Sequence, residues 1–335
     1  MALDTIVALD VVLADGCLVH VTATSHPELF YALRGAAESF GIITTFYLQT
    51  EPAPSSVINF SFGLSAVLSS AATAANAFLS LQNFVLSSPL VNRNISFGIY
   101  TDGNAFTLAG WSFEDEDYFS NTIRPAMLSG FPPPSSTSIR SLSWLDSLVN
   151  EAGGPLSEPL TGYNAHDTFY AKSVVTRESQ PLTLSALESF FSYIITQGRE
   201  SVDPWFTIIN LYGGIDSQIN NLRPGAAPAA YSDRDSLWVL QNYGYTPNSK
   251  PPFQPAITSF ITGLNEALTS AQPSGNFGAY LNYIDPDLTP TEAALLYYGN
   301  DTYTRLVELK KKYDPQTLFW NPQAVGNADL GNSGT

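Results

Sequence analysis

Three tyrosines lie where a sheet could present their phenol groups to a ligand. Tyr212, Tyr243 and Tyr283 each fall in an apolar, strand-like run of the sequence. A phenol can take up a proton near neutral pH only when its pKa is lowered, which requires a nearby cation or several hydrogen-bond donors. Lys172, the only lysine in its own apolar run, is either such a cation or a strand-end residue whose stem reaches solvent.

Polar side chains on the same strands are candidates for substrate contacts. Because side chains alternate between the two faces of a strand, Asn210 shares a face with Tyr212, and Gln241 shares a face with Tyr243. Together with Lys172, these two amides are the residues that we expect to bind a substrate.

The elements that position these residues alternate between strands and helices. Period-2 alternation predicts strands at 57–62, 95–101, 105–113, 168–175, 205–212, 237–243 and 279–284, and apolar periodicity predicts helices at 66–86, 114–128, 182–197 and 255–270. In the last strand, Tyr283 would share a face with Leu281. This order predicts an α+β fold in which a large antiparallel sheet is covered on one face by helices. The open face would form one wall of a pocket.

The first fifty residues predict a smaller group of elements. Asp15-Gly16 predicts a tight hairpin turn. Ser25 and Glu28 match a capping box and predict a helix that ends at Gly35. Gly41 precedes a β-branched run that predicts a buried strand.

Segments near both ends of the chain resemble one enzyme family. Residues 11–54, VVLADGCLVHVTATSHPELFYALRGAAESFGIITTFYLQTEPAP, resemble the end of the FAD-binding domain of berberine bridge enzyme-like oxidases, in the vanillyl-alcohol oxidase (p-cresol methylhydroxylase-type) superfamily. Residues 297–325, YYGNDTYTRLVELKKKYDPQTLFWNPQAV, resemble that family's closing helix and flavin-side tail. Between them, TFYAKSVV, AAYSDRD and YLNYIDPDL resemble landmarks of its substrate domain.

The resemblance implies a domain division and a cofactor. Residues 1–52 would be the second half of an FAD-binding domain, 53–298 a substrate-binding α+β domain, 299–326 a return to the FAD-binding domain, and 327–335 a disordered tail. The residues implied to contact FAD are Gly35, Phe40, Gly41, Ile42, Asn321 and Gln323. Glu38 lies where relatives usually have glycine, and its carboxylate would repel a pyrophosphate.

The resemblance also implies a reaction. Members of the family oxidise an alcohol or amine carbon of a small molecule by hydride transfer to flavin, while a base takes the hydroxyl proton. Tyr283 matches the position of the family's catalytic tyrosine, and Tyr212 and Tyr243 lie on strands that also supply bases or substrate contacts.

The sequence lacks the family's Gly-rich SGGH loop, which belongs to an N-terminal flavin subdomain. One expectation is therefore a truncated and impaired oxidase. A second is a flavin-free homologue that binds or cyclises a small molecule in secondary metabolism. A third is a secreted glycan-binding or structural protein.

Composition limits the partners. The 335 residues carry a formal charge of −16, with only 14 basic side chains, which argues against nucleic acid or anionic membranes as partners. No apolar run is long enough to span a membrane, and no Cys and His spacing suggests a metal site. The expected partner is a small-molecule substrate.

Two further expectations concern the surface and the location of the protein. The half-domain of residues 3–50 should expose apolar strand edges, through which two copies could form a homodimer. Residues 1–16 do not resemble a signal peptide. The acidic composition and the sequons at Asn59, Asn94 and Asn300 nevertheless predict that the parent protein enters the secretory pathway.

Overall fold

The structure is a computed structural model that describes residues 1–157 and 166–330. The chain forms two compact units. Unit 1 comprises Met1–Pro52, Gln218–Arg234 and Pro286–Thr335, and unit 2 comprises Ala53–Ser217 and Asp235–Asp285. The expected tail 327–335 lies partly outside the described residues.

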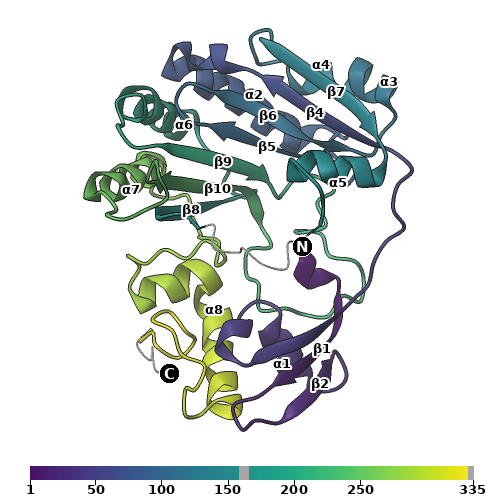
Figure 1. The fold of residues 1–335 in the computed structure, drawn as a ribbon, viewed down its shortest axis with the longest axis vertical. Helices are drawn as coiled ribbons and strands as arrows, with labels where there is room; N and C mark the ends of the chain where they lie inside the picture. Colours follow the sequence, from purple (N-terminus) through teal and green to yellow (C-terminus); the bar gives the residue numbers. More distant parts are fainter. Residues whose placement is uncertain (158–165, 331–335) are drawn as a thin grey trace. The chain divides into compact units, whose positions relative to one another are not determined.

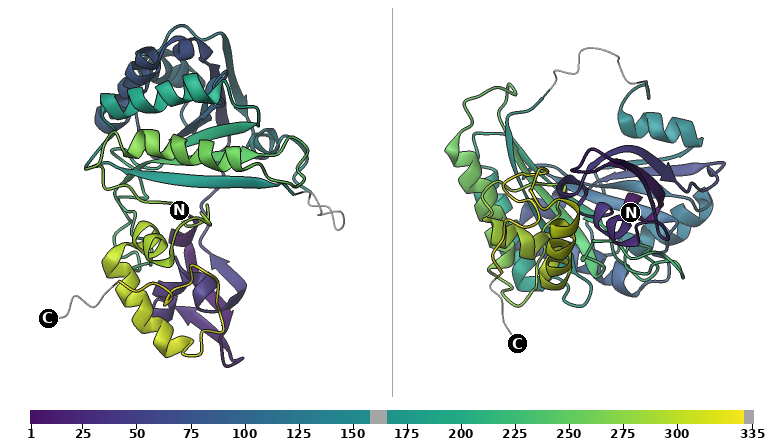
Figure 2. Two further views of the ribbon diagram at one scale, coloured as in Figure 1. Left: turned by 90° about the vertical axis from the view of Figure 1, so that its left-hand side faces the viewer. Right: turned by 90° about the horizontal axis from the view of Figure 1, so that it is seen from below.

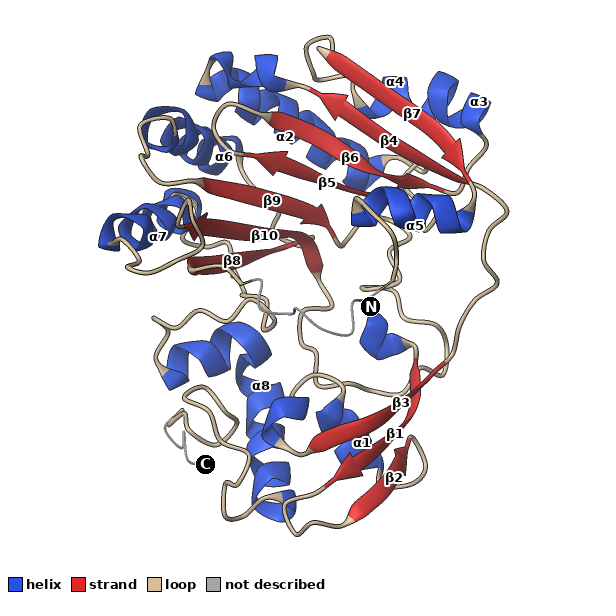
Figure 3. Cartoon of the chain, viewed as in Figure 1, coloured by secondary structure: helices blue, strands red, loops and turns tan. Residues whose placement is uncertain are grey.

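Unit 2 is built on a seven-stranded antiparallel sheet with the order β7-β4-β6-β5-β9-β10-β8 (Figures 1 and 3). Alternate side chains point to one face, where Phe97, Ile99, Phe106 and Leu108 are buried. The strands are β4 (Val57–Gly63), β5 (Ile95–Thr101), β6 (Phe106–Ser112), β7 (Ser136–Leu142), β8 (Phe169–Arg177), β9 (Trp205–Leu211) and β10 (Ser236–Tyr245).

Helices cover this apolar face of the sheet (Figure 2). Phe78 of α2 packs against Trp238 of β10, with ring centroids 5.2 Å apart, and against Phe191 of α6, with ring centroids 6.1 Å apart; α2 spans Ala71–Ser87 and α6 spans Leu184–Tyr193. The predicted α+β sheet with helices on one face is therefore confirmed. The three helices are α2 (Ala71–Ser87), α6 (Leu184–Tyr193) and α7 (Pro255–Thr269).

The opposite face is covered at one end by α5 (Trp144–Ala152), which packs on β4 and β7 (Figure 3). Neither α5 nor β7 was predicted. For β7, the mostly polar run SSTSIRSL lacks clear alternation. The helix expected at 114–128 is also divided. It consists of α3 (Glu116–Tyr118), a π-helical turn (Phe119–Ile123) and α4 (Arg124–Met127). A second π-helical turn (Ile194–Gly198) continues α6, and a 3-10 helix (Ser65–Ser69) precedes α2.

Unit 1 contains a three-stranded sheet with the order β2-β1-β3. The predicted turn at Asp15-Gly16 is confirmed, and it joins β1 and β2. Helix α8 begins with a capping box between Thr289 and Glu292 and kinks at Gly299, where φ is +67°. The elements are β1 (Ile6–Val12), β2 (Leu18–Thr22), β3 (Ile42–Leu48), α1 (Pro27–Leu33), α8 (Pro290–Tyr313) and two 3-10 helices (Ala2–Asp4 and Ala37–Ser39).

Two local predictions for unit 1 are wrong. Helix α1 has His26 as its N-cap, in the left-handed region at φ +56°, so the expected capping box at Ser25 does not form. Strand β3 is not buried, since Ile42, Phe46 and Leu48 are 60%, 55% and 53% exposed. Because β3 is an edge strand, the expectation of an exposed apolar edge is confirmed. Association of two copies through it stays a prediction.

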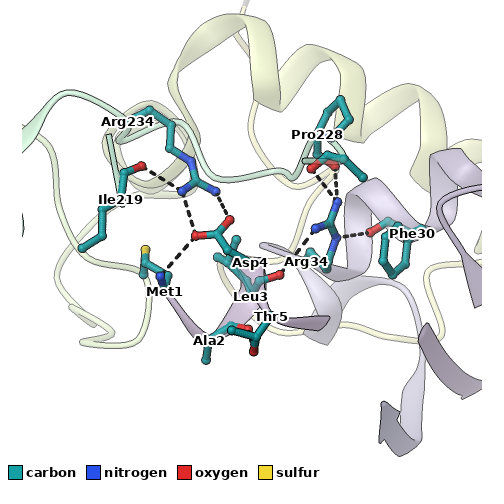
Figure 4. A network of polar contacts seen from close by, with 11 residues as sticks. Met1, Ala2, Leu3, Asp4, Thr5, Phe30, Arg34, Ile219, Pro228 and Arg234 are labelled. Atoms are coloured by element: carbon teal, nitrogen blue, oxygen red, sulfur yellow. Dashed lines mark hydrogen bonds and ion pairs between the residues drawn. The ribbon is translucent and has the colours of Figure 1, made fainter. Parts of the chain in front are cut away.

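Two arginines hold the segment 218–234 in unit 1 (Figure 4). Arg34, at the end of α1, donates hydrogen bonds to the carbonyl oxygens of Ala227 and Pro228 at 2.9 and 2.5 Å. Arg234 donates to both carboxylate oxygens of Asp4, at 2.7 and 3.0 Å. Arg234 also donates to the Ile219 carbonyl oxygen at 2.9 Å. The bonds from the two arginines to carbonyl groups thus satisfy backbone oxygens of a segment that has no regular secondary structure.

Candidate functional site

A basin of about 510 Å³ lies on the open face of the sheet in unit 2. Its floor is made of small or short side chains, because Ala109, Gly98 and Asn210 lie side by side on β6, β5 and β9. Trp111 and Tyr100 lie two residues along their strands from this row, on the same face, and form walls. The alternation of the strands thus builds a hollow between aromatic rings.

Polar groups complete the rim of the basin. Glu151, in the last turn of α5, and Tyr212, just beyond β9, both line it. Trp111 packs edge to face on Trp144 of α5, with ring centroids 6.1 Å apart, and this contact restrains the Trp111 ring. Aromatic rings beside an amide and a carboxylate can bind a ligand that has apolar faces and several hydroxyl groups.

The residues 278–285, here called the tyrosine segment, adjoin this rim. The Tyr280 ring contacts Tyr212 at 6.0 Å and Tyr283 at 5.0 Å, both edge to face. The strand predicted at 279–284 is wrong, because the Tyr283 amide donates to the Tyr280 carbonyl at 2.9 Å and closes a turn. The alternation that paired Tyr283 with Leu281 therefore does not apply.

The pKa of the Tyr283 phenol is raised, whereas a tyrosine that acts as a base near neutral pH needs a lowered pKa. Burial, with a smaller contribution from Tyr280, raises the pKa of the Tyr283 phenol. Lys172 does not counteract this shift, since it is paired with Asp285. A phenol in this state keeps its proton near neutral pH and acts as a hydrogen-bond donor.

Tyr243 lies apart from the other two tyrosines. It is opposite Phe206 of β9, and Tyr212 lies six residues further along that strand direction, which corresponds to roughly 20 Å. Its ring stacks between Phe206 and Phe169, with centroids 4.9 and 4.7 Å away. Burial and a hydrogen bond to Asp167 raise its pKa. The structure therefore brings together Tyr212 and Tyr283, through Tyr280. Tyr243 belongs instead to an aromatic row that reaches the basin wall at Tyr100 through Phe206.

The three residues expected to bind substrate have different surroundings. Asn210 lines the basin, and Gln241 is on the open face, directly opposite Ile208, which also lines it. Lys172 is directly opposite Asn242, whose amide contacts Asn265 of α7, so its side chain is on the helix-covered face. Lys172 is therefore neither a solvent-reaching strand end nor a cation on the open face.

Comparisons with known proteins agree on one family. Residues 279–326 match the family model described as "Berberine and berberine like". The chain is 31% identical to a xylooligosaccharide oxidase of Thermothelomyces thermophilus over 98% of its own length and 64% of that protein. It is 28% identical to a chitooligosaccharide oxidase of Gibberella zeae, over 97% of its own length and 63% of that protein.

Solved structures give the same answer. A xylooligosaccharide oxidase from Myceliophthora thermophila C1, in complex with xylobiose, matches 98% of this chain and 67% of its own, at 29% identity and a TM-score of 0.84. The chain belongs to the berberine bridge enzyme-like family of FAD-linked oxidases. It spans slightly less than two thirds of the length of these curated relatives.

The residues expected to contact FAD all lie in unit 1. A glucooligosaccharide oxidase from Acremonium strictum, 26% identical with a TM-score of 0.85, is described with a 6-S-cysteinyl, 8α-N1-histidyl FAD. In this chain, a Cβ on Gly35 would lie 2.1 Å from the Ala230 carbonyl oxygen, and one on Gly41 would lie 2.6 Å from Val11. Both glycines are therefore required by packing within unit 1.

The other expected contacts are also explained by unit 1 itself. Phe40 is fully buried and Ile42 presents an exposed apolar side chain. Asn321 accepts the Gln323 amide at 2.9 Å, and Gln323 donates to the Leu288 carbonyl at 3.2 Å. Contacts within unit 1 thus account for the described positions of these residues.

Glu38 is engaged within unit 1 as well. Its carboxylate accepts a hydrogen bond of 3.1 Å from the hydroxyl of Tyr298, a buried residue of α8. Burial and the nearby carboxylate raise the pKa of Tyr298 well above its ordinary value. The Glu38 carboxylate thus has a hydrogen-bond partner of its own. Its repulsion of a pyrophosphate stays a prediction.

Most residues that line the basin were not identified from the sequence. Trp111, Tyr100, Glu151 and Gly98 all line it. The signal was present on β5 and β6, where one face of each strand carries two small residues followed by an aromatic one. Glu151 had no such signal, because α5 was not predicted.

Neither a metal site nor a membrane span is found in the part of the chain that the structure describes. No group of three or more His, Cys, Asp or Glu residues there is placed to hold a metal ion. No helix among residues 1–157 and 166–330 is both long and apolar enough to cross a bilayer.

Proposed function

We propose that unit 2 binds an oligosaccharide in the basin, as the substrate-binding part of an FAD-linked carbohydrate oxidase. The observation that carries this proposal is the small floor of Gly98 and Ala109 between the rings of Trp111 and Tyr100. Relatives named as xylooligosaccharide and chitooligosaccharide oxidases support it. One relative was solved with xylobiose bound.

The chemistry of the basin suits a sugar. A pyranose ring has apolar C–H faces, which an aromatic ring can cover, and hydroxyl groups, which amides and carboxylates can bind. Trp111 and Tyr100 supply the rings, and Asn210 and Glu151 supply the polar partners. We assign to Tyr212 and Tyr283 hydrogen bonds to the hydroxyl groups at the end of the sugar that reaches the tyrosine segment.

Filling the floor of the basin tests the proposal directly. A Cβ on Gly98 would lie 2.6 Å from the Asn210 amide oxygen, which can move because it ends a flexible side chain, and 3.2 Å from the Ile209 carbonyl oxygen, which requires a shift of a few tenths of an ångström. We therefore expect Gly98→Ala to fold normally and to lower oligosaccharide affinity about tenfold, or about 1.4 kcal/mol. Gly154→Ala is the matched control, since its Cβ would meet no atom within 4 Å. Equal affinities of the two variants in calorimetric titration would place the sugar elsewhere.

The protonation of Tyr283 gives a second prediction. Because burial raises its pKa, the phenol should ionise only above the ordinary tyrosine pKa of about 10. We expect the difference in tyrosinate absorbance between the wild type and Tyr283→Phe to appear only in that range. A component that titrates between pH 7 and 9 would instead show a resident phenolate, as a catalytic base requires.

A flavin-free pocket protein is the second candidate. It is favoured by one observation: the described segments around Gly35–Ile42 and Asn321–Gln323 use their glycines and amides for internal packing. An absorbance spectrum from 300 to 550 nm, before and after adding FAD and dialysing, separates the two candidates. Retained flavin bands would support the oxidase, and a colourless protein that still binds sugars would support the flavin-free pocket.

We propose that the parent protein enters the secretory pathway, and the sequons provide a test. Asn59 is buried on β4, and the half-buried Asn94 donates to Glu114 at 2.9 Å, whereas Asn300 is exposed after the kink of α8. Protein from its native cells should therefore carry a glycan at Asn300 and none at Asn59. Peptide N-glycosidase treatment with mass spectrometry checks this, and an unmodified Asn300 would contradict the proposed location.

A further inference from the structure

The tyrosine segment has no helix or strand of its own, so other contacts must fix its shape. Three contacts fasten it to β8, which is an edge strand. Gly278 exchanges two backbone hydrogen bonds with Val175, at 2.8 and 3.0 Å. The Tyr280 amide donates to the Ser173 hydroxyl at 2.8 Å. Lys172 forms an ion pair with Asp285 at the far end of the segment.

The third contact is largely buried. The side chains of Lys172 and Asp285 are only 11% and 7% exposed. The Tyr170 hydroxyl also donates to Asp285, at 3.4 Å, and the Lys172 ammonium lies 5.5 Å from the centroid of the Tyr170 ring. A buried carboxylate with these partners is costly to leave unpaired, so the pair resists separation.

The contacts lie on opposite faces of β8. Ser173 is directly opposite Gln241, on the open face, whereas Lys172 is opposite Asn242, on the helix-covered face. The segment therefore passes around the edge of the sheet and is fixed at both sides. Tyr280 and Tyr283 lie between these two fixed points.

We propose that Lys172 and Asp285 are positioning residues, which clamp the tyrosine segment so that Tyr280 and Tyr283 are held at the rim of the basin. The effect of the clamp on sugar binding rests on the proposed function of the basin. The ordering of the tyrosine segment does not depend on that function. Without the ion pair, the segment stays attached through Gly278 and Ser173 but loses its second fixed point. The two rings then sample several positions, and a ligand must order them on binding.

The test combines hydrogen exchange with sugar titration on the full chain. In Lys172→Met, we expect amide exchange in residues 278–285 to accelerate at least tenfold, while exchange in β5 and β6 stays unchanged. We expect the affinity for xylooligosaccharides to fall several-fold, and Lys172→Arg to restore both. Arg93→Met is the control, because the Arg93–Asp216 pair of unit 2 is exposed, at 55% and 41%.

The outcomes separate the clamp from the proposed function. Faster exchange confined to the segment in a protein whose wild type binds no sugar would support the clamp and overturn sugar binding. Unchanged exchange in Lys172→Met would overturn the clamp. If Lys172→Met fails to fold, Asp285→Asn replaces it, and the same exchange pattern is expected. Faster exchange throughout unit 2 in Asp285→Asn would show a general structural role and also overturn the proposal.

Discussion

Replacing Lys310 with methionine is expected to lower the free energy of unfolding by about 3–5 kcal/mol, because it leaves a buried carboxylate without its cation. The Lys310 ammonium donates to Asp314 at 2.6 Å and to the carbonyl oxygens of Ser39 and Phe319 at 2.7 and 2.8 Å. Lys310 is 3% exposed and Asp314 is fully buried. One side chain thus joins α8, the 3-10 helix Ala37–Ser39 and the segment after α8.

The electrostatics of Asp314 explain why the loss should be large. Burial alone raises the pKa of this carboxyl, but hydrogen bonds from Lys310 and from the Phe319 and Leu318 amides lower it overall. The stability that Asp314 contributes is therefore present above its unfolded pKa and is lost as the pH falls through the lower folded value. The wild type should lose this contribution on acidification, and Lys310→Met should already lack most of it at neutral pH.

Chemical denaturation of two further variants provides the comparison. Lys312→Met is the matched control, because the Lys312–Glu28 pair is 58% and 49% exposed and should contribute nothing measurable. The double variant Lys310→Met with Asp314→Asn should recover part of the loss, since no charge stays buried. A wild-type denaturation curve for Lys310→Met would show that the pair does not stabilise unit 1.

Replacing Trp111 with alanine is expected to weaken oligosaccharide binding by at least tenfold. Aromatic side chains at the centre of a binding surface commonly account for 2 kcal/mol or more when truncated. Trp111 is the largest wall of the basin and is held in place by Trp144. Trp111→Phe should keep part of the affinity, because a smaller ring still covers one face of a sugar.

A tryptophan outside the basin separates this effect from a general one. Trp320 is 64% exposed in unit 1 and does not line the basin. Trp320→Ala should therefore bind sugar as the wild type does, in the same calorimetric titration. An equal loss in both variants would mean that the affinity of Trp111→Ala falls for reasons unrelated to the basin.

The sequence predicted the regular parts of unit 2 well, because strands with one buried face alternate strictly. The run 95–101 predicted β5 at the bounds that the structure has, and 255–270 predicted α7 to within one residue. Elements without such a pattern were missed. β7 is mostly polar, with Ile139 and Leu142 as its apolar residues, and α5 is a short helix whose only fully buried residue is Ser147.

The candidate site was predicted less well, since it depends on contacts between distant residues. Asn210 and Tyr212 were identified, and both line the basin. Of the two alternatives for Lys172, the solvent-reaching strand end is wrong, because the side chain is on the helix-covered face and is paired with Asp285. Alternation defines two faces without saying which of them the helices cover. Tyr283 was wrongly placed on a strand, since its segment owes its shape to Asp285 and β8.

The most direct test of the account is calorimetric titration of the purified chain, without added FAD, with xylo-, cello- and chito-oligosaccharides of two to five units. We expect saturable binding of at least one series, tightest for the longer members and weakened in both Gly98→Ala and Trp111→Ala. Absence of binding by all three series, in a protein that unfolds cooperatively, would contradict the assignment of the basin as an oligosaccharide site.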